Sequence, residues 1–331
     1  LNSAYGALGN EFFRFFDVRQ ASAITTSGQL VIRWIEKELN AYFNKLLKTE
    51  NKDYVIASDT DSIYLDLSEL VEQTIKRTKP DAVTADVISF LDKVCENKIQ
   101  GFIDKSYGQL ADCLNVFDQK MQMKREALAD KGVWTAKKRY ILNVHDNEGV
   151  VYAKPKLKIM GIEAVKSSTP AVCRQAITEA LNIIMTKGED DLHKFIADFK
   201  AKFSQMSFEE VAFPRSIQDV TKYEKEKQKS IPIHVRGALL YNDLIKKMKL
   251  QKKYELIKDG EKIRFSYMKL PNPLHTNVIC SFSSLPTEFD LDNYIDYEMQ
   301  FEKAFLSPLN TILQTINWNS EKVNTLEDFF S

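Results

Sequence analysis

The sequence has few residues that interrupt secondary structure, with 11 glycines and 9 prolines among 331 residues. Long structureless linkers are therefore not expected. The four cysteines, Cys95, Cys113, Cys173 and Cys280, lie far apart, and no Cys-x-x-Cys or Cys/His spacing typical of a metal site occurs. We interpret them as thiols of a reducing compartment. No apolar run approaches the roughly 18 residues of a membrane span, and no stretch has the pattern of a signal peptide.

The sequence also has no net charge, because 46 basic residues balance 46 acidic ones. This balance argues against a nucleic-acid binder with a basic surface throughout. The charge is nevertheless clustered: residues 137–139, 154–158 and 246–264 are locally basic, and residues 288–302 are acidic. Local binding of a polyanion remains compatible with this pattern.

Hydrophobic periodicity predicts a helix over residues 17–48, whose apolar stripe comprises Val31, Ile35, Leu39, Tyr42 and Leu46. Residues 54–67 are rich in β-formers around a polar turn, residues 58–62, and predict a hairpin with acids at its tip. A second helix is expected over residues 86–103.

The next part of the chain predicts strands at 119–128, 134–144 and 150–159, with turns at Lys131-Gly132 and Asp146-Asn147. Helices are expected at 170–187 and 190–203, followed by short strands and a helix ending near Ile316. Together these elements predict an α+β fold: an antiparallel sheet packed on helices, then a mostly helical part with a small β element. We place a domain boundary near Gly161.

The predicted hairpin carries Asp59-Thr60-Asp61-Ser62 at its tip. Two carboxylates two residues apart give a compact negative patch, which suits Mg²⁺ in two-metal phosphoryl or nucleotidyl transfer. The alternative is an ordinary acidic turn, since Asp and Ser favour turns. An EF-hand is excluded, because its fifth, sixth and twelfth positions from Asp59 would be Ile63, Tyr64 and Leu70.

Two further motifs frame this turn: Asn2-Ser3-Ala4-Tyr5-Gly6 precedes it, and Lys137-Lys138-Arg139-Tyr140 follows it. In this order the three motifs resemble motif B, motif C and the palm Lys-Lys-Arg-Tyr element of the family B DNA polymerases. The similarity is greatest to the replicative polymerases of T-even-type tailed bacteriophages and spans essentially the whole chain. Segments that carry it include Ala23 to Thr26, Arg125-Glu126-Ala127, Pro155 to Gly161, Lys166 to Pro170 and His234-Val235-Arg236-Gly237.

The resemblance implies roles at the reaction centre. Asp61 would be the principal motif C ligand of two Mg²⁺ ions, with Asp59 in a secondary role and Glu126 as an accessory acid. The residues implied near the nascent base pair or the incoming nucleotide are Asn2, Tyr5, Gly6 and Thr60.

The resemblance also implies contacts to primer–template DNA. Lys137, Lys138 and Tyr140 would hold the primer near its terminus, with Arg139 in support and Ser62 nearby. Contacts to the duplex product are implied for Lys166, His234 and Arg236. Against these roles stand ordinary alternatives: a triple-basic run is often a solvated face, Tyr140 would suit a core, and His234 a surface position.

The last residues form a separate motif, in which Leu326 is followed by Phe329 and Phe330. Apolar anchors at this spacing suit a groove on a partner, and the segment resembles the sliding-clamp-binding peptide of phage-type polymerases. The alternative is a terminus packed on its own domain.

Motif A, an aspartate followed by a Ser-Leu-Tyr-Pro-type segment, does not occur in the sequence, and neither do the acidic motifs of a proofreading exonuclease. The chain also begins at Leu1 within an expected helix. We therefore expect an N-terminal chain or region to complete the enzyme, and the isolated chain not to polymerise DNA. The alternatives are a non-catalytic DNA- and clamp-binding module of the same descent and, last, an unrelated metal-dependent nuclease.

The domains implied are the end of a fingers helix at 1–11, the palm at 12–161, the thumb at 162–322 and a clamp-binding tail at 323–331. Deoxynucleoside triphosphates, primer–template DNA and a sliding clamp are the expected partners. The expected location is the cytoplasm of an infected bacterium, for a phage-encoded protein.

Overall fold

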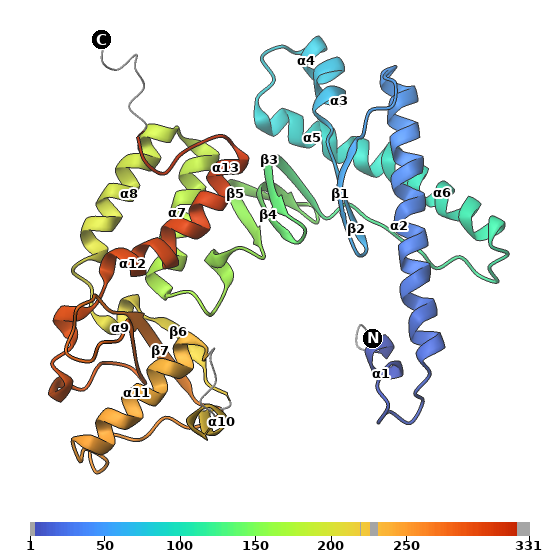
Figure 1. The fold of residues 1–331 in the computed structure, drawn as a ribbon. Coiled ribbons are helices and arrows are strands. Elements are labelled where there is room, and N and C mark those ends of the chain that lie inside the picture. The colour runs from blue at the N-terminus through green and yellow to red at the C-terminus, as the bar shows by residue number, and fades with distance from the viewer. Residues whose placement is uncertain (1–3, 219, 226–230, 323–331) are drawn as a thin grey trace, which may run out of the picture. The chain divides into compact units, whose positions relative to one another are not determined.

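The computed structural model describes residues 4–218, 220–225 and 231–322. The chain divides into two compact units: Leu1–Asp130 with Asn143–Lys156, and Lys131–Leu142 with Leu157–Ser331. The division falls within three strands that form one sheet, β3-β4-β5 (Figure 1). Antiparallel sheets packed on helices confirm the predicted α+β class.

The first unit is organised around the long helix α2, Val18–Leu47, which follows the short helix α1, Ala4–Leu8. Asp17 caps α2 by accepting a hydrogen bond from the backbone N–H of Arg19. The helix predicted over residues 17–48 is confirmed, but its buried stripe is Ile35, Leu39, Phe43 and Leu47. Leu46, predicted in the stripe, is exposed, because the i, i+4 spacing from Ile35 leads to Phe43 and Leu47 instead.

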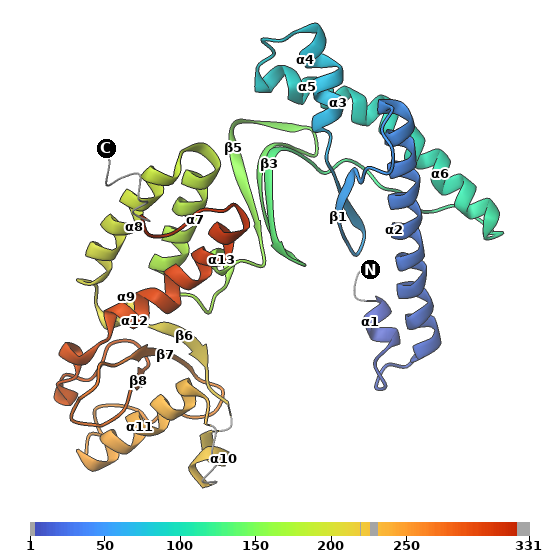
Figure 2. The same ribbon diagram turned by 45° about the horizontal axis from the view of Figure 1, so that its top comes forward.

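The core of the first unit is completed by further helices. They are α3 (Ser68–Gln73), α4 (Ile75–Thr78), α5 (Thr84–Val94), a π-helical segment (Cys95–Ile99) and α6 (Gln100–Cys113). Of these, α3 and α6 contact α2. The predicted helix at 86–103 is confirmed and continues to Cys113. Helix α6 crosses α2 (Figures 1 and 2), where Ile103 and Tyr107 join Phe43 in one apolar cluster.

Strands β3 (Ala127–Ala136), β4 (Arg139–Asn147) and β5 (Val150–Met160) correct the strand and turn predictions for this region. Residues 119–126 are not a strand, and the turn predicted at Lys131-Gly132 is wrong because both residues lie inside β3. Gly132 serves close packing instead: a Cβ there would come within 2.6 Å of the Trp134 ring and 2.8 Å of Leu142.

The chain turns instead at Lys137-Lys138, where Lys138 has φ +60°. The strand predicted at 134–144 is therefore wrong, because this turn divides it between β3 and β4. The next turn lies at Glu148-Gly149, two residues after the predicted Asp146-Asn147, and both its residues have positive φ (51° and 85°). This is the backbone that a two-residue hairpin favours.

The second unit contains two apolar cores. The first joins α7 (Ala171–Thr186), α8 (Glu189–Phe203), α12 (Tyr297–Phe301), a π-helical segment (Glu302–Leu306) and α13 (Ser307–Thr315). The predicted helices at 170–187, 190–203 and up to Ile316 are confirmed. Ile177 and Leu181 of α7 meet Phe199, Phe305 and Ile312 in this core.

The second core contains the predicted small β element. Strands β6 (Phe213–Ser216), β7 (Lys262–Tyr267) and β8 (Val278–Ser281) pair antiparallel in that order. Around them lie α9 (Phe208–Val211), α10 (Val220–Lys225) and α11 (Ile233–Lys247), with α11 packed along β8 (Figure 2). Gly237 permits this approach, since a Cβ there would lie 2.5 Å from the Sγ atom of Cys280. No described helix is long and apolar enough to cross a membrane.

Candidate active-site hairpin and basic residues

The four-residue acidic motif forms the tip of a tight hairpin between β1, Val55–Asp59, and β2, Ser62–Leu65. Asp59 pairs with Ser62, so Thr60 and Asp61 are the two turn residues. The predicted hairpin with acids at its tip is confirmed. Asp61 is exposed and Asp59 is half-buried, so both carboxylates lie where a ligand from solvent has access.

The backbone of this turn is constrained. Thr60 has φ +56°, in the left-handed region that β-branched residues rarely adopt. The turn is held by the Asp59 carbonyl, which accepts hydrogen bonds from the Asp61 N–H (2.6 Å) and the Ser62 hydroxyl (3.2 Å). The Thr60 hydroxyl also donates to the Asp59 carboxylate at 3.1 Å. Such backbone strain, costing about 1–3 kcal/mol, concentrates at functional sites.

The tip supplies two carboxylates, and within the described residues no group of three or more His, Cys, Asp or Glu side chains is arranged to hold a metal. Glu126, predicted as an accessory acid, is therefore not grouped with both aspartates. It lies just before β3, where its carbonyl accepts a hydrogen bond from the Glu148 N–H at 2.6 Å. Two exposed carboxylates nevertheless provide the hard oxygen donors that Mg²⁺ prefers.

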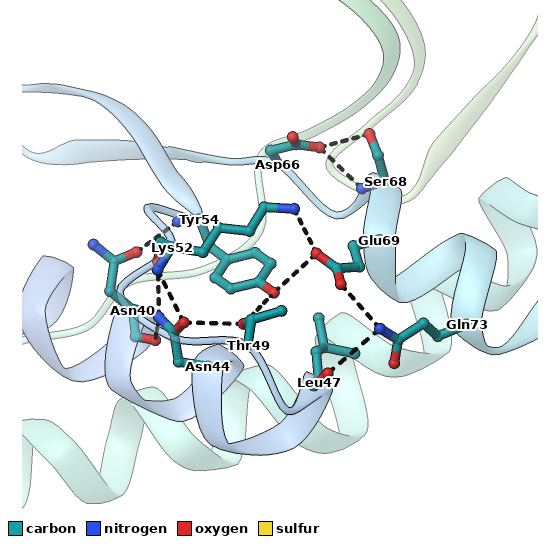
Figure 3. Close-up of polar contacts among 10 residues, drawn as sticks. All are labelled: Asn40, Asn44, Leu47, Thr49, Lys52, Tyr54, Asp66, Ser68, Glu69 and Gln73. Atoms are coloured by element: carbon teal, nitrogen blue, oxygen red, sulfur yellow. Dashed lines mark hydrogen bonds and ion pairs between the residues drawn. The ribbon is translucent and has the colours of Figure 1, made fainter.

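The base of the hairpin is fixed to α2 by asparagine side chains (Figure 3). The Asn40 side-chain oxygen accepts from the backbone N–H groups of Tyr54 (2.8 Å) and Val55 (2.9 Å). One turn later, the Asn44 amide donates to the Lys52 carbonyl at 2.7 Å and accepts from the Lys52 N–H at 3.0 Å. These bonds satisfy backbone groups at and just before the start of β1, and they fix the position of this strand relative to α2.

Tyr54 extends this network to α3 (Figure 3). Its ring is fully buried, with the centroid 5.3 Å from that of Phe43, while its hydroxyl lies 2.9 Å from the Thr49 hydroxyl and donates to Glu69 at 3.2 Å. Glu69 also pairs with Lys52. The hydrogen bond from Lys52 holds the pKa of Glu69 below its ordinary value, and the same bond raises the pKa of Lys52.

The sequence predictions missed this supporting network. Asn40 and Asn44 lie four residues apart beside the buried Leu39 and Phe43. Two amide side chains at this spacing lie on one side of the helix, at the edge of its apolar stripe, and this pattern could have indicated a polar contact there. Nothing in the sequence pattern indicates that their partners are backbone groups at the start of β1.

The basic motif occupies a second hairpin turn, in the second unit. Lys137 and Lys138 are exposed at the turn between β3 and β4. Arg139 is half-buried and donates two hydrogen bonds to Glu163, at 3.1 and 2.8 Å. Tyr140 is only 4% exposed and its ring centroid lies 6.2 Å from that of Trp134, so most of its ring serves the core.

The other predicted DNA-binding residues of the second unit lie on different elements. Lys166 follows a short 3-10 helix, Glu163–Val165, and donates to the Glu163 carboxylate at 2.8 Å. Arg236, on α11, is exposed and donates to the Asn277 side chain at 2.8 Å. His234 is half-buried near the start of α11, with its ring 6.3 Å from that of Phe265.

Of the remaining candidates, Tyr5 and Gly6 lie on the short helix α1 and are exposed. Asn2 and the tail residues Leu326, Phe329 and Phe330 lie outside the described residues.

His234 gives a prediction for the pH dependence of stability. Burial lowers the pKa of His234, and the positive charge of Arg215 lowers it further. The unfolded chain therefore takes up a proton near pH 6.5, before the folded chain does. The contribution of His234 to stability is complete above pH 6.5 and is lost as the pH falls below 6.5 through the lowered pKa of the folded chain. Because the site is partly exposed, solvent screening keeps this loss small.

Urea unfolding between pH 8 and pH 5 measures this effect. His234→Gln should flatten the slope below pH 6.5, whereas the control His275→Gln, at an exposed histidine, should keep it. An unchanged slope in His234→Gln would show that His234 is not its source.

Both hairpin turns lie in a segment that matches a known protein family. A family model for the divergent family B DNA polymerases matches residues 44–206, which contain the acidic turn and the basic turn. The chain therefore carries a family B DNA polymerase domain over these residues.

Two curated relatives extend the match to the whole chain. It is 34% identical over 345 residues to the DNA-directed DNA polymerase of Enterobacteria phage T4, and 35% identical over 346 residues to that of Escherichia phage RB69. Each alignment covers 100% of this chain but 38% of the relative, its C-terminal part. The resemblance inferred from the three motifs is thus confirmed, and the chain spans well under half the length of these relatives.

Proposed function

We propose that the chain is the C-terminal, motif C-bearing portion of an enzyme that performs template-directed nucleotidyl transfer in DNA replication. The observation that carries the proposal is the pair of accessible carboxylates, Asp59 and Asp61, on a constrained turn inside the family match. Both relatives are named as DNA-directed DNA polymerases, which does not favour the non-catalytic module.

In the proposed reaction, a primer 3′-hydroxyl attacks the α-phosphate of a deoxynucleoside triphosphate, a new phosphodiester bond forms and pyrophosphate leaves. Bound Mg²⁺ would activate the attacking oxygen and stabilise the leaving group. Asp61, exposed at the tip, would hold the metal, with Asp59 in the secondary position. The Thr60 hydroxyl orients the Asp59 carboxylate, and the Ser62 hydroxyl holds the turn backbone through the Asp59 carbonyl.

The remaining predicted contacts are part of the same proposal. Exposed Tyr5 and Gly6 on α1 would face the nascent base pair, and Asn2 the incoming nucleotide. Phosphates of primer and product duplex would be contacted by Lys137, Lys138, Lys166, His234 and Arg236, with Arg139 and Tyr140 supporting the basic turn. Contacts of this type position DNA without reading its sequence and weaken as salt rises.

Exposed aromatic residues in the first unit support a protein partner. Phe12 is 89% exposed and Phe15 67%, in the segment between α1 and α2, and Phe117 is fully exposed after α6. The Phe15 ring lies 5.8 Å from that of Phe13, also exposed, and an exposed apolar patch commonly marks an interface. We propose that a second polypeptide region covers these aromatic side chains and supplies the motif A aspartate. This region would correspond to the part of the relatives that the chain does not match. A sliding clamp would bind Leu326, Phe329 and Phe330, and the enzyme would act in a phage-infected bacterial cell.

Reconstitution tests the proposal. The isolated chain should bind primer–template DNA yet show no primer extension, because one carboxylate pair from motif C does not complete a two-metal site. Adding a polypeptide that contains the preceding region of the T4 relative should restore extension by at least about 1000-fold.

Phe12→Ser with Phe15→Ser should weaken this reconstitution, whereas Val83→Ser, at another exposed apolar position of the first unit, should not. Robust extension by the isolated chain would overturn the requirement for a partner. Absence of extension in every combination would overturn the proposed activity.

A further inference from the structure

The basic turn of the second unit is tied to one carboxylate. Glu163 accepts two hydrogen bonds from the Arg139 guanidinium, at 3.1 and 2.8 Å, and one from the Lys166 ammonium at 2.8 Å. The carboxylate and the guanidinium are both largely shielded, with side-chain exposures of 21% and 26%. A planar, bidentate pair of this kind fixes direction as well as distance.

A second contact fixes the backbone of the same turn. Gly161 has φ +67°, and a Cβ at that position would lie 2.1 Å from the Lys138 carbonyl oxygen and 3.2 Å from Cγ of Arg139. The turn therefore rests directly on the end of β5, at a site that only glycine fits. Gly161 and Glu163 hold the turn from two adjacent points.

The charge around Glu163 remains positive. A hollow of about 480 Å³ is lined by Arg139, Glu163 and Lys166 together with Arg215 and Lys303. Four cations and one carboxylate thus line the hollow. Burial raises the pKa of Glu163, but the hydrogen bonds from Arg139 and Lys166 outweigh this and hold it below its ordinary value. Glu163 is consequently ionised at neutral pH and remains a fixed anchor.

We propose that Glu163, together with Gly161, is a positioning residue that orients the Lys137-Lys138 turn and Lys166 as one rigid array toward the backbone phosphates of bound DNA. This inference rests on the proposed function. It gives a role in DNA binding to Glu163, whose negative charge would repel a phosphate at direct contact. Its competitor is simple electrostatics, in which Glu163 only reduces the local positive potential.

The two accounts predict opposite signs. Glu163→Gln removes the one negative charge from a hollow that four cations also line, so electrostatics predicts tighter DNA binding. If Glu163 positions the array, the variant loses the bidentate pair and the orientation of the turn. We then expect about 5- to 10-fold weaker binding of primer–template DNA. The slope of log affinity against log salt should also fall by about one, the loss of one ordered phosphate contact.

Fluorescence anisotropy with a labelled primer–template duplex, over a salt series and with the full chain, measures both quantities. Glu179→Gln, at an exposed glutamate on α7, is the matched control for the change in charge and should bind DNA as tightly as wild type or slightly more tightly. Glu163→Asp keeps the charge but shortens the side chain, and it should also bind more weakly at constant net charge.

Tighter or unchanged binding by Glu163→Gln, with a salt slope like that of Glu179→Gln, would overturn the inference. If circular dichroism shows that Glu163→Gln does not fold, Glu163→Asp decides: wild-type affinity in that variant equally overturns it. Failure of the wild-type chain to bind the duplex would instead refute the proposed function.

Discussion

Asp61→Ala should reduce primer extension by the reconstituted polymerase at least about 1000-fold, because it removes the principal carboxylate proposed to hold both metal ions. The residue is exposed at the tip of a two-residue turn and does not pair in the strand ladder. Its loss should therefore leave the fold intact. The measurement is single-turnover extension of a labelled primer at saturating nucleotide.

Two comparisons make this result specific. The affinity of Asp61→Ala for primer–template DNA should stay within about twofold of wild type, since the basic residues proposed to bind DNA are unchanged. Asp81→Asn, at an exposed aspartate in the loop before α5, should extend primers normally. Substantial extension by Asp61→Ala would remove the acidic turn from the active site.

Tyr54→Ala should lower the free energy of unfolding by about 3–5 kcal/mol, the range for deleting a fully buried aromatic side chain. Tyr54 is 0% exposed and packs on Phe43, and its hydroxyl links Thr49 of the segment after α2 to Glu69 of α3. Tyr54→Phe retains the packing and removes only the hydroxyl, so it should cost about 1–2 kcal/mol.

Urea unfolding of the isolated chain, followed by circular dichroism, measures both variants. Phe117→Ala deletes an aromatic ring of the same unit that is fully exposed, and it should change the unfolding free energy by less than about 0.5 kcal/mol. If Tyr54→Ala were no less stable than Phe117→Ala, the hairpin would not depend on this buried anchor.

Elements with a clear period were predictable from the sequence. Helix α2 follows its apolar spacing, and the acidic hairpin follows from two β-rich segments around a polar turn. Gly132 led to a wrong prediction, because glycine is common in turns. In the structure it lies within β3, where it leaves room for the Trp134 ring and for the Leu142 side chain of β4. This close packing depends on the pairing of β3 with β4, which the composition around Gly132 does not indicate.

The candidate site divides in the same way. Asp59 and Asp61 were identified from their motif, since the chemistry requires those side chains at that spacing. The residues that hold them in place were not, because Asn40 and Tyr54 act through backbone and hydroxyl contacts formed only after α2 and α3 have packed. The pairing of Arg139 with Glu163 likewise has no local pattern, because it forms only where the start of β4 meets the segment after β5.

Metal binding tests the central claim most directly, that Asp61 belongs to a two-metal site which a second polypeptide region completes. Mn²⁺, which replaces Mg²⁺ at oxygen-ligand sites, can be titrated by electron paramagnetic resonance into the reconstituted polymerase with primer–template and nucleotide. We expect two tightly bound ions in the wild-type complex, loss of tight binding in Asp61→Ala, and only weak binding by the isolated chain. Two tightly bound ions in the Asp61→Ala complex, or in the isolated chain, would contradict the account.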